Sequence, residues 1–68
     1  MVEVGAIYRD TYSETEFAVT DAPDPFADGD PDNELVELRR LGDDEVFTVF
    51  ADTFRENHVR IAASEEDL

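Results

Sequence analysis

The sequence contains no cysteine and no lysine, and it has no long apolar run. Without cysteine, disulfides, thiolate nucleophiles and cysteine-ligated zinc or iron–sulfur sites are excluded. No apolar stretch approaches the roughly 18 residues that a membrane-spanning helix needs, and the acidic N-terminal region lacks the basic start of a signal peptide. We therefore expect a soluble cytoplasmic protein that does not associate with a membrane.

Carboxylates dominate what is present. The 68 residues include 19 Asp or Glu and only 5 basic residues, which gives a formal net charge of −14. Since 41% of the residues are hydrophobic, the chain is too apolar to remain disordered. A chain this short holds one domain with one small core. We expect that domain to cover residues 1–63, with residues 64–68 as a flexible acidic tail.

The basic residues are all arginine: Arg9, Arg39, Arg40, Arg55 and Arg60. Together with the Asp-rich stretch Asp21-Ala22-Pro23-Asp24-Pro25 and the missing cysteine, this composition resembles that of small acidic cytoplasmic proteins of extremely halophilic archaea. In molar salt the Debye length is about 3 Å, so uncompensated carboxylates hardly repel one another. The resemblance implies a potassium-rich cytoplasm and a fold that strengthens as salt increases.

Alternation of apolar and polar residues predicts strands over residues 2–8, 16–21, 34–41 and 45–50, and a short fifth strand over 59–61. In the first strand, Val2, Val4, Ala6 and Tyr8 share one face and Ile7 lies on the other. The residues expected to point into the core from the second and third strands are Phe17, Val19, Val36 and Leu38. In the fourth strand Phe47 and Val49 share one face and Val46, Thr48 and Phe50 the other, and either Phe47 or Phe50 contributes to the core. The sequence Gly42-Asp43-Asp44 predicts a tight hairpin turn, because Gly and Asp tolerate positive φ.

Two segments interrupt this pattern. Residues 21–33 hold all three prolines and five aspartates, which predicts a long surface loop. Thr53 and Glu56 have the spacing of a capping box, so we expect one helical turn with Thr53 as its N-cap. This turn stands directly before the last predicted strand.

The element order over residues 2–62 resembles that of an SH3-like small β-barrel. The resemblance implies an all-β fold, in which five strands close into a barrel and a short helical turn precedes the last strand. Closure removes sheet edges that would otherwise promote aggregation. The alternative is a twisted open meander with the helical turn packed on one face, closed by dimerisation.

No catalytic or cofactor-binding pattern stands out. His58 is the only histidine, and neither a nucleophile elbow nor a glycine-rich phosphate loop is present. We interpret His58 as a polar residue that closes the helical turn. Residues 24–35 partly match a calcium loop, but Phe26 and Leu35 stand where ligands are required. We therefore expect no enzyme, no cofactor and no metal site.

Two aromatic residues are not needed for the expected core: Tyr12 in the first turn and Phe26 in the acidic loop. SH3-like barrels bind peptides in a groove walled by loop aromatics, with acidic residues selecting basic ligands. The resemblance therefore implies a partner-binding groove formed by Tyr12, Phe26, Asp28 and Asp30. Alternatively, Phe26 pins the loop to the barrel. Our leading hypothesis is a non-enzymatic protein-binding module, either monomeric or weakly dimeric.

Two other functions stay open. One is a nucleic-acid-associated regulator, which would use Arg39, Arg40, Arg55 and Arg60 if the third and fifth predicted strands lie close together. The acidic surface argues against nucleic-acid binding. It favours instead the pairing of these arginines with carboxylates such as Glu37, Glu45 and Glu56. The other function is a dimeric structural subunit.

Overall fold

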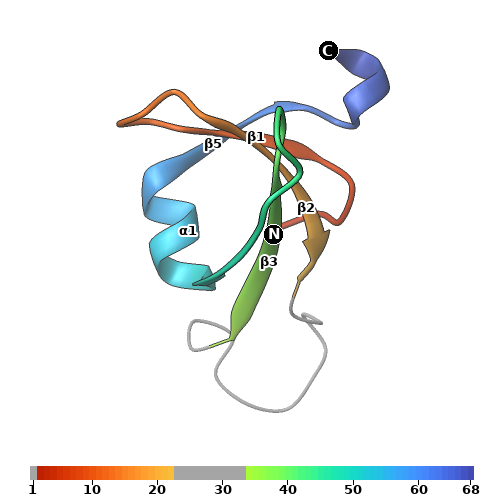
Figure 1. The fold of residues 1–68 in the computed structure, drawn as a ribbon. Helices are drawn as coiled ribbons and strands as arrows, with labels where there is room; N and C mark the ends of the chain where they lie inside the picture. The colour runs from red at the N-terminus through yellow and green to blue at the C-terminus, as the bar shows by residue number, and fades with distance from the viewer. Residues whose placement is uncertain (1, 23–33) are drawn as a thin grey trace.

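The computed structural model describes residues 2–22 and 34–68, which form a five-stranded antiparallel sheet with one α-helix (Figure 1). The strands are β1 (Ile7–Asp10), β2 (Glu16–Asp21), β3 (Leu35–Arg40), β4 (Val46–Phe50) and β5 (His58–Ala62). Helix α1 (Ala51–Asn57) stands between β4 and β5, and a short 3₁₀ helix, η2 (Glu65–Asp67), follows β5. The prediction of a mainly β fold with five strands and a helical element before the last strand is confirmed.

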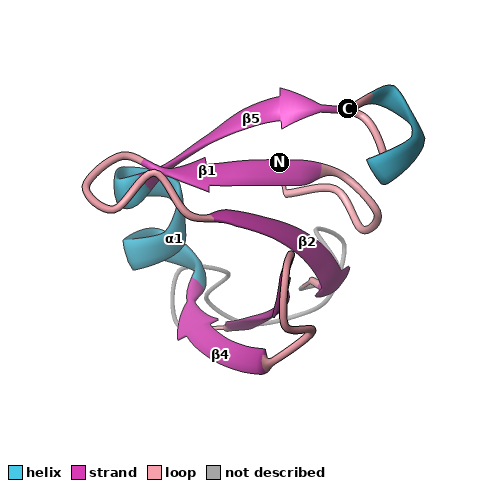
Figure 2. Ribbon diagram, turned by 45° about the horizontal axis from the view of Figure 1, so that its top comes forward, coloured by secondary structure: helices cyan, strands magenta, loops and turns pink. Residues whose placement is uncertain are grey.

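The strand order in the sheet is β4-β3-β2-β1-β5. The first four strands pair in chain order, and β5 returns to pair antiparallel with β1. Helix α1 contacts β3, β4 and β5, and Figure 2 shows it between β4 and the pair formed by β1 and β5. Within the described ranges β4 does not pair with β5, so the sheet is open and helix α1 links its two edge strands.

The core lies between the inner face of the sheet and α1. Its buried members are Ala6, Tyr8, Val19, Val36, Leu38, Ala51 and Phe54. The predicted inward positions of β2 and β3 are confirmed by Val19, Val36 and Leu38, which are 0–2% exposed. The aromatic residues Phe17 and Phe47 also face inward but stay half-buried, because they lie near one end of the sheet.

The first strand was predicted over residues 2–8, and this is wrong at its start. The chain turns at Gly5, whose φ is 92°, and the Gly5 backbone N donates to the Val19 carbonyl oxygen at 2.8 Å. Positive φ is easily adopted by glycine and ends the regular alternation there. Val4 is consequently 62% exposed instead of inward, whereas Ile7 on the outer face is fully buried.

Helix α1 begins two residues before the predicted N-cap. Phe50 is the residue at the N-cap and makes no side-chain capping bond, so the prediction of Thr53 as the N-cap is wrong. The chain passes directly from β4 into the helix, and the Ala51 backbone N donates to the Glu34 carbonyl oxygen at 2.9 Å. Burial of Ala51 and Phe54 fixes this helix start more strongly than the capping pattern does.

The C-terminal residues make a contact with the sheet that the sequence did not indicate. Residues 65–67 form η2, and Glu65 pairs with Arg39 of β3. The flexibility of residues 64–68 stays a prediction. Arg39 lies on the outer face of the sheet, where Ile7 and Ala18 are buried. The tail therefore returns to the outer face. In the described part of the chain, no helix is long and apolar enough to cross a membrane.

Candidate functional site

Two turns with the same backbone geometry lie at one end of the sheet. Residues 11–15 join β1 to β2, and residues 41–45 join β3 to β4. In each turn the last strand residue, Asp10 or Arg40, donates its backbone N to the carbonyl oxygen five residues on, at 2.8 Å. The fourth residue of each turn, Glu14 or Asp44, has a φ of 60°. The hairpin predicted at residues 42–44 is confirmed.

An open hollow of about 410 Å³ lies on the inner face beside these turns. We call it the turn-end hollow; it is lined by Asp10, Ser13, Thr15, Phe17, Leu38, Arg40, Phe47, Val49 and His58. These residues come from all five strands and from the first turn. Phe17 and Phe47 meet edge to face with ring centroids 6.1 Å apart, which gives the hollow an aromatic wall.

A row of aromatic rings connects this wall to the core. His58 meets Phe17 edge to face at 5.7 Å and stacks on Phe54 at 4.6 Å, and Phe54 stacks on Tyr8 at 4.7 Å. The His58 Nδ1 also lies 3.0 Å from the Phe54 carbonyl oxygen. His58 ends α1 as its C-cap, which confirms the interpretation that this residue closes the helical turn.

Asp10 is the carboxylate of the turn-end hollow. Its Oδ1 accepts hydrogen bonds from the backbone N of Tyr12 at 2.8 Å and of Ser13 at 3.2 Å. These two bonds lower the pKa of Asp10; burial opposes them less strongly, and the nearby His58 adds the smallest lowering effect. The Asp10 Oδ2 lies 3.7 Å from His58 Nε2. The hollow therefore carries a stable negative charge at one side.

Arg40 forms the opposite side of the hollow. Its guanidinium lies 5.0 Å from the centre of the Phe47 ring, and it pairs with Asp43 and, at 2.7 Å, with Glu45. Hydrogen bonding from Arg40 lowers the pKa of Asp43 to about 2. The hollow thus offers aromatic rings between a carboxylate and an arginine whose charge is already compensated by two neighbouring carboxylates.

The structure places one of the four predicted partner-binding residues. Tyr12 lies in the first turn and is 85% exposed. It is not itself in the lining of the turn-end hollow, but it directly precedes Ser13, which is. Phe26, Asp28 and Asp30 lie outside the described residues, so their grouping with Tyr12 stays a prediction. β2 runs from the turn that carries Tyr12 to Asp21 at the opposite end of the sheet, just before that segment.

Sequence reasoning did not assign Asp10, Phe17, Arg40, Phe47 and His58 to a common site. The alternation within each strand indicates which residues face inward, but not which of them reach the end of the sheet and stay half-open. One local signal was present for Asp10. An Asp at the start of a polar turn commonly accepts hydrogen bonds from the backbone N–H groups of the next residues of that turn.

The arginines do not form the expected cluster. β2 and β1 separate β3 from β5 in the sheet, so the condition for Arg39 and Arg40 to gather with Arg60 is not met. Arg40 pairs with Glu45 as predicted. The remaining recorded pairs join Arg9 to Glu16, Arg39 to Asp44 and Glu65, and Arg60 to Glu3.

Comparison of this chain with protein-family models, with curated proteins and with solved structures found no match. In residues 2–22 and 34–68 no group of three or more His, Asp or Glu side chains is placed to hold a metal ion. The chemistry of the turn-end hollow is therefore the main guide to function.

Proposed function

We propose that this protein is a non-enzymatic interaction module, an SH3-like small barrel that binds a basic segment of a protein partner at the turn-end hollow in a high-salt cytoplasm. The observation that carries the proposal is the aromatic-walled hollow that contains the Asp10 carboxylate. Tyr12, which is 85% exposed, precedes Ser13 of its lining in the chain and supports the proposal. The pairing of β5 with β1 and the position of α1 before the last strand support an SH3-like topology, in which the described strands form an open sheet.

The chemistry of the hollow favours arginine as the residue that a partner inserts. A guanidinium stacks well on aromatic faces and pairs with carboxylates, and both kinds of group are offered by Tyr12, Phe17 and Asp10. One Asp10 oxygen already accepts two backbone hydrogen bonds, so the carboxylate is held in place before binding and loses little entropy when it is engaged.

The net charge of −14 favours a partner segment that carries positive charge. In molar salt, long-range attraction disappears because the Debye length is about 3 Å. Charge then acts only between atoms in contact, such as Asp10 and an inserted guanidinium, while apolar contact with Tyr12 and Phe17 supplies most of the affinity. A partner segment that alternates basic and apolar residues fits these requirements.

The proposal is tested by NMR titration in molar KCl with a synthetic peptide that alternates arginine and leucine. We expect saturable shifts of the backbone amides of Asp10, Ser13, Phe17 and His58. A matched peptide with glutamate in place of arginine is expected to leave these amides unchanged. Equal binding of the two peptides, or shifts confined to the outer face, would show that the turn-end hollow is not a basic-segment site.

A second function, a dimeric structural subunit, is favoured by the edge strand β4. Its five residues are all uncharged, although 35% of the chain is charged. The backbone N of Arg40 donates to the Glu45 carbonyl oxygen, so these two residues are a hydrogen-bonded pair. Because such pairs alternate along a ladder, the backbone groups of Val46, Thr48 and Phe50 point away from β3. The unprotected edge could pair with β4 of a second copy.

Sedimentation in molar KCl tests this second function. A dimer that forms through β4 should dissociate when Thr48→Lys places a charge at the centre of the paired edges. A charge placed on the other edge strand, Val59→Lys, is expected to leave the dimer intact. A wild-type chain that sediments as a monomer over the accessible concentration range would exclude the dimeric role.

A further inference from the structure

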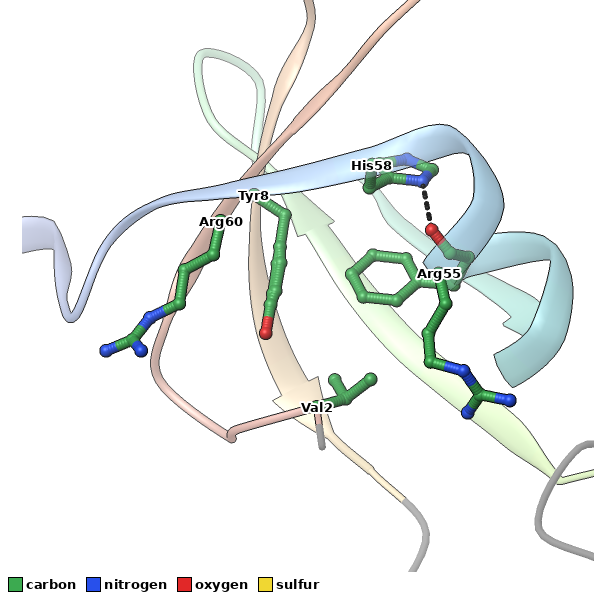
Figure 3. Close-up of a pocket in the computed structure, with 6 residues that line it drawn as sticks. Val2, Tyr8, Arg55, His58 and Arg60 are labelled. Atoms are coloured by element: carbon green, nitrogen blue, oxygen red, sulfur yellow. Dashed lines mark hydrogen bonds between the residues drawn. The ribbon is translucent and has the colours of Figure 1, made fainter.

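A second hollow, of about 290 Å³, shares His58 and no other lining residue with the turn-end hollow. We call it the α1–β5 pocket; it is lined by Val2, Tyr8, Phe54, Arg55, His58 and Arg60. Figure 3 shows Arg60 and Arg55 on opposite sides of this pocket, with Tyr8 and Val2 between them. Two cationic side chains thus flank an apolar floor, on a chain that carries a large negative charge.

The Tyr8 hydroxyl is the neutral hydrogen-bonding group of this pocket. Tyr8 is 6% exposed, and its ring is fixed by stacking on Phe54. Its hydroxyl is directed into the pocket (Figure 3). In the described residues no buried side-chain oxygen or nitrogen lacks a partner, so this hydroxyl is reached by solvent through the open pocket. A ligand in the pocket can therefore accept its hydrogen bond in place of water.

Arg60 lies beside this hydroxyl for a structural reason. Tyr8 of β1 and Arg60 of β5 are direct cross-strand partners, so their side chains emerge on the same face at neighbouring positions. Arg60 is half-exposed and contacts Glu3 at 3.4 Å, which is a surface ion pair of the weak kind. An incoming anion can replace Glu3 at this guanidinium with little loss of stability.

We propose that the α1–β5 pocket binds a small organic carboxylate with an apolar body. The carboxylate accepts a hydrogen bond from the Tyr8 hydroxyl and pairs with Arg60. The apolar body lies against Val2 and Phe54. The apolar floor is what selects an aromatic or aliphatic acid over a bare inorganic anion, because an inorganic anion would leave that floor uncovered.

NMR titration with benzoate, benzamide and acetate tests the proposal at one fixed salt concentration. Benzoate is expected to give saturable shifts of the Tyr8 ring and of the Arg60 side-chain N–H. Benzamide has the same shape without the charge, and acetate has the charge without the ring. Both are expected to bind at least about tenfold more weakly than benzoate, because each lacks one of the two kinds of contact. Benzamide binding as tightly as benzoate would overturn the carboxylate assignment.

Two variants and a control locate the binding site. Tyr8→Phe removes only the hydroxyl and is expected to weaken benzoate binding about threefold to tenfold without lowering the free energy of unfolding. Arg60→Gln is expected to weaken it about tenfold or more. Arg9→Gln, which removes an arginine paired with Glu16 on the outer face, should bind benzoate like the wild type. Unchanged affinity in Tyr8→Phe, or an equal loss in Arg9→Gln, would refute the proposed site.

Discussion

The ring of His58 stacks on the ring of Phe54, with centroids 4.6 Å apart and planes inclined by 24°. The same histidine places Nδ1 3.0 Å from the Phe54 carbonyl oxygen, so Nδ1 carries the hydrogen of that bond. Its Nε2 faces Asp10 Oδ2 at 3.7 Å. One side chain therefore connects the end of α1 to the end of β1, and it separates the turn-end hollow from the α1–β5 pocket.

Removing this connection should destabilise the fold. His58→Ala is expected to lower the free energy of unfolding by about 2–3 kcal/mol, because it deletes two ring contacts and one hydrogen bond. Val59→Ala is the matched control: the neighbouring side chain is 51% exposed, and its loss should cost less than about 1 kcal/mol. Chemical denaturation of both variants in molar KCl measures the difference. Similar losses for the two variants would mean that His58 does not join α1 to β1.

Stability should fall at acid pH in a window set by two aspartates. The pKa of Asp43 is about 2, below its ordinary value of 3.8, chiefly because Arg40 donates hydrogen bonds to it. The pKa of Asp10 is lowered by its two backbone hydrogen bonds. A carboxyl with a lowered folded-state pKa stabilises the fold above the unfolded value, and this contribution is lost as pH falls through the folded value. We expect the loss between about pH 4 and pH 2.

Asn variants test this assignment in molar salt, where changes in overall repulsion are small. Asp43→Asn and Asp10→Asn should each flatten the fall in unfolding free energy over that window. Glu66→Gln removes the same charge from η2 and should leave the slope as in the wild type. If the free energy of unfolding falls equally steeply with pH in the wild type and all three variants, groups other than Asp10 and Asp43 control the loss of stability in acid.

The two turns make a further prediction about backbone strain. Glu14 and Asp44 both have a φ of 60°, a conformation that glycine adopts without steric cost. Glu14→Gly is expected to raise the free energy of unfolding by up to about 1 kcal/mol. Asp44→Gly should raise the free energy of unfolding less, because it also removes the ion pair of Asp44 with Arg39, at 2.5 Å. Ser13→Gly is the control and should lower the free energy of unfolding, since the Ser13 hydroxyl accepts a hydrogen bond from the Thr15 backbone N. A loss of stability in Glu14→Gly would contradict this account of the turns.

Salt should stabilise the fold through screening. With a net charge of −14 on 68 residues, we expect the free energy of unfolding to rise steadily from millimolar to molar KCl, as the Debye length shortens from about 30 Å to about 3 Å. Sucrose, which strengthens burial without screening charge, should stabilise much less at equal osmolality. Equal stability at both ends of the KCl series would contradict the proposed adaptation to high salt.

Much of the sheet could be predicted because its signal is local. Alternating apolar residues gave β2 with its observed bounds and gave β3 and β4 to within a residue or two at each end. The first strand was misplaced because Gly5 turns the chain before it, and glycine carries no apolar signal of its own. The helix start was misplaced because burial of Ala51, a tertiary effect, prevailed over the capping pattern at Thr53.

The candidate site was largely beyond prediction for a different reason. Asp10 and His58 are far apart in the sequence and meet only because β5 pairs with β1, in a register that matches these two residues. The exposure of Tyr12 could be predicted, since an aromatic residue in a polar turn has no place in the core. The turn-end hollow could not be predicted, because it depends on the half-open positions of Phe17 and Phe47 at the end of the sheet.

The most direct test of the proposed binding function compares two exposed aromatic residues. Tyr12 is 85% exposed in the first turn, next to Ser13 of the turn-end hollow, and Phe50 is 55% exposed on the outer face of β4. Tyr12→Ala keeps the backbone N that binds Asp10, so its unfolding free energy should stay within about 0.5 kcal/mol of the wild type. The dissociation constant of the arginine–leucine peptide should rise about tenfold in Tyr12→Ala and stay unchanged in Phe50→Ala. Wild-type affinity in Tyr12→Ala, or an equal loss in Phe50→Ala, would contradict the account.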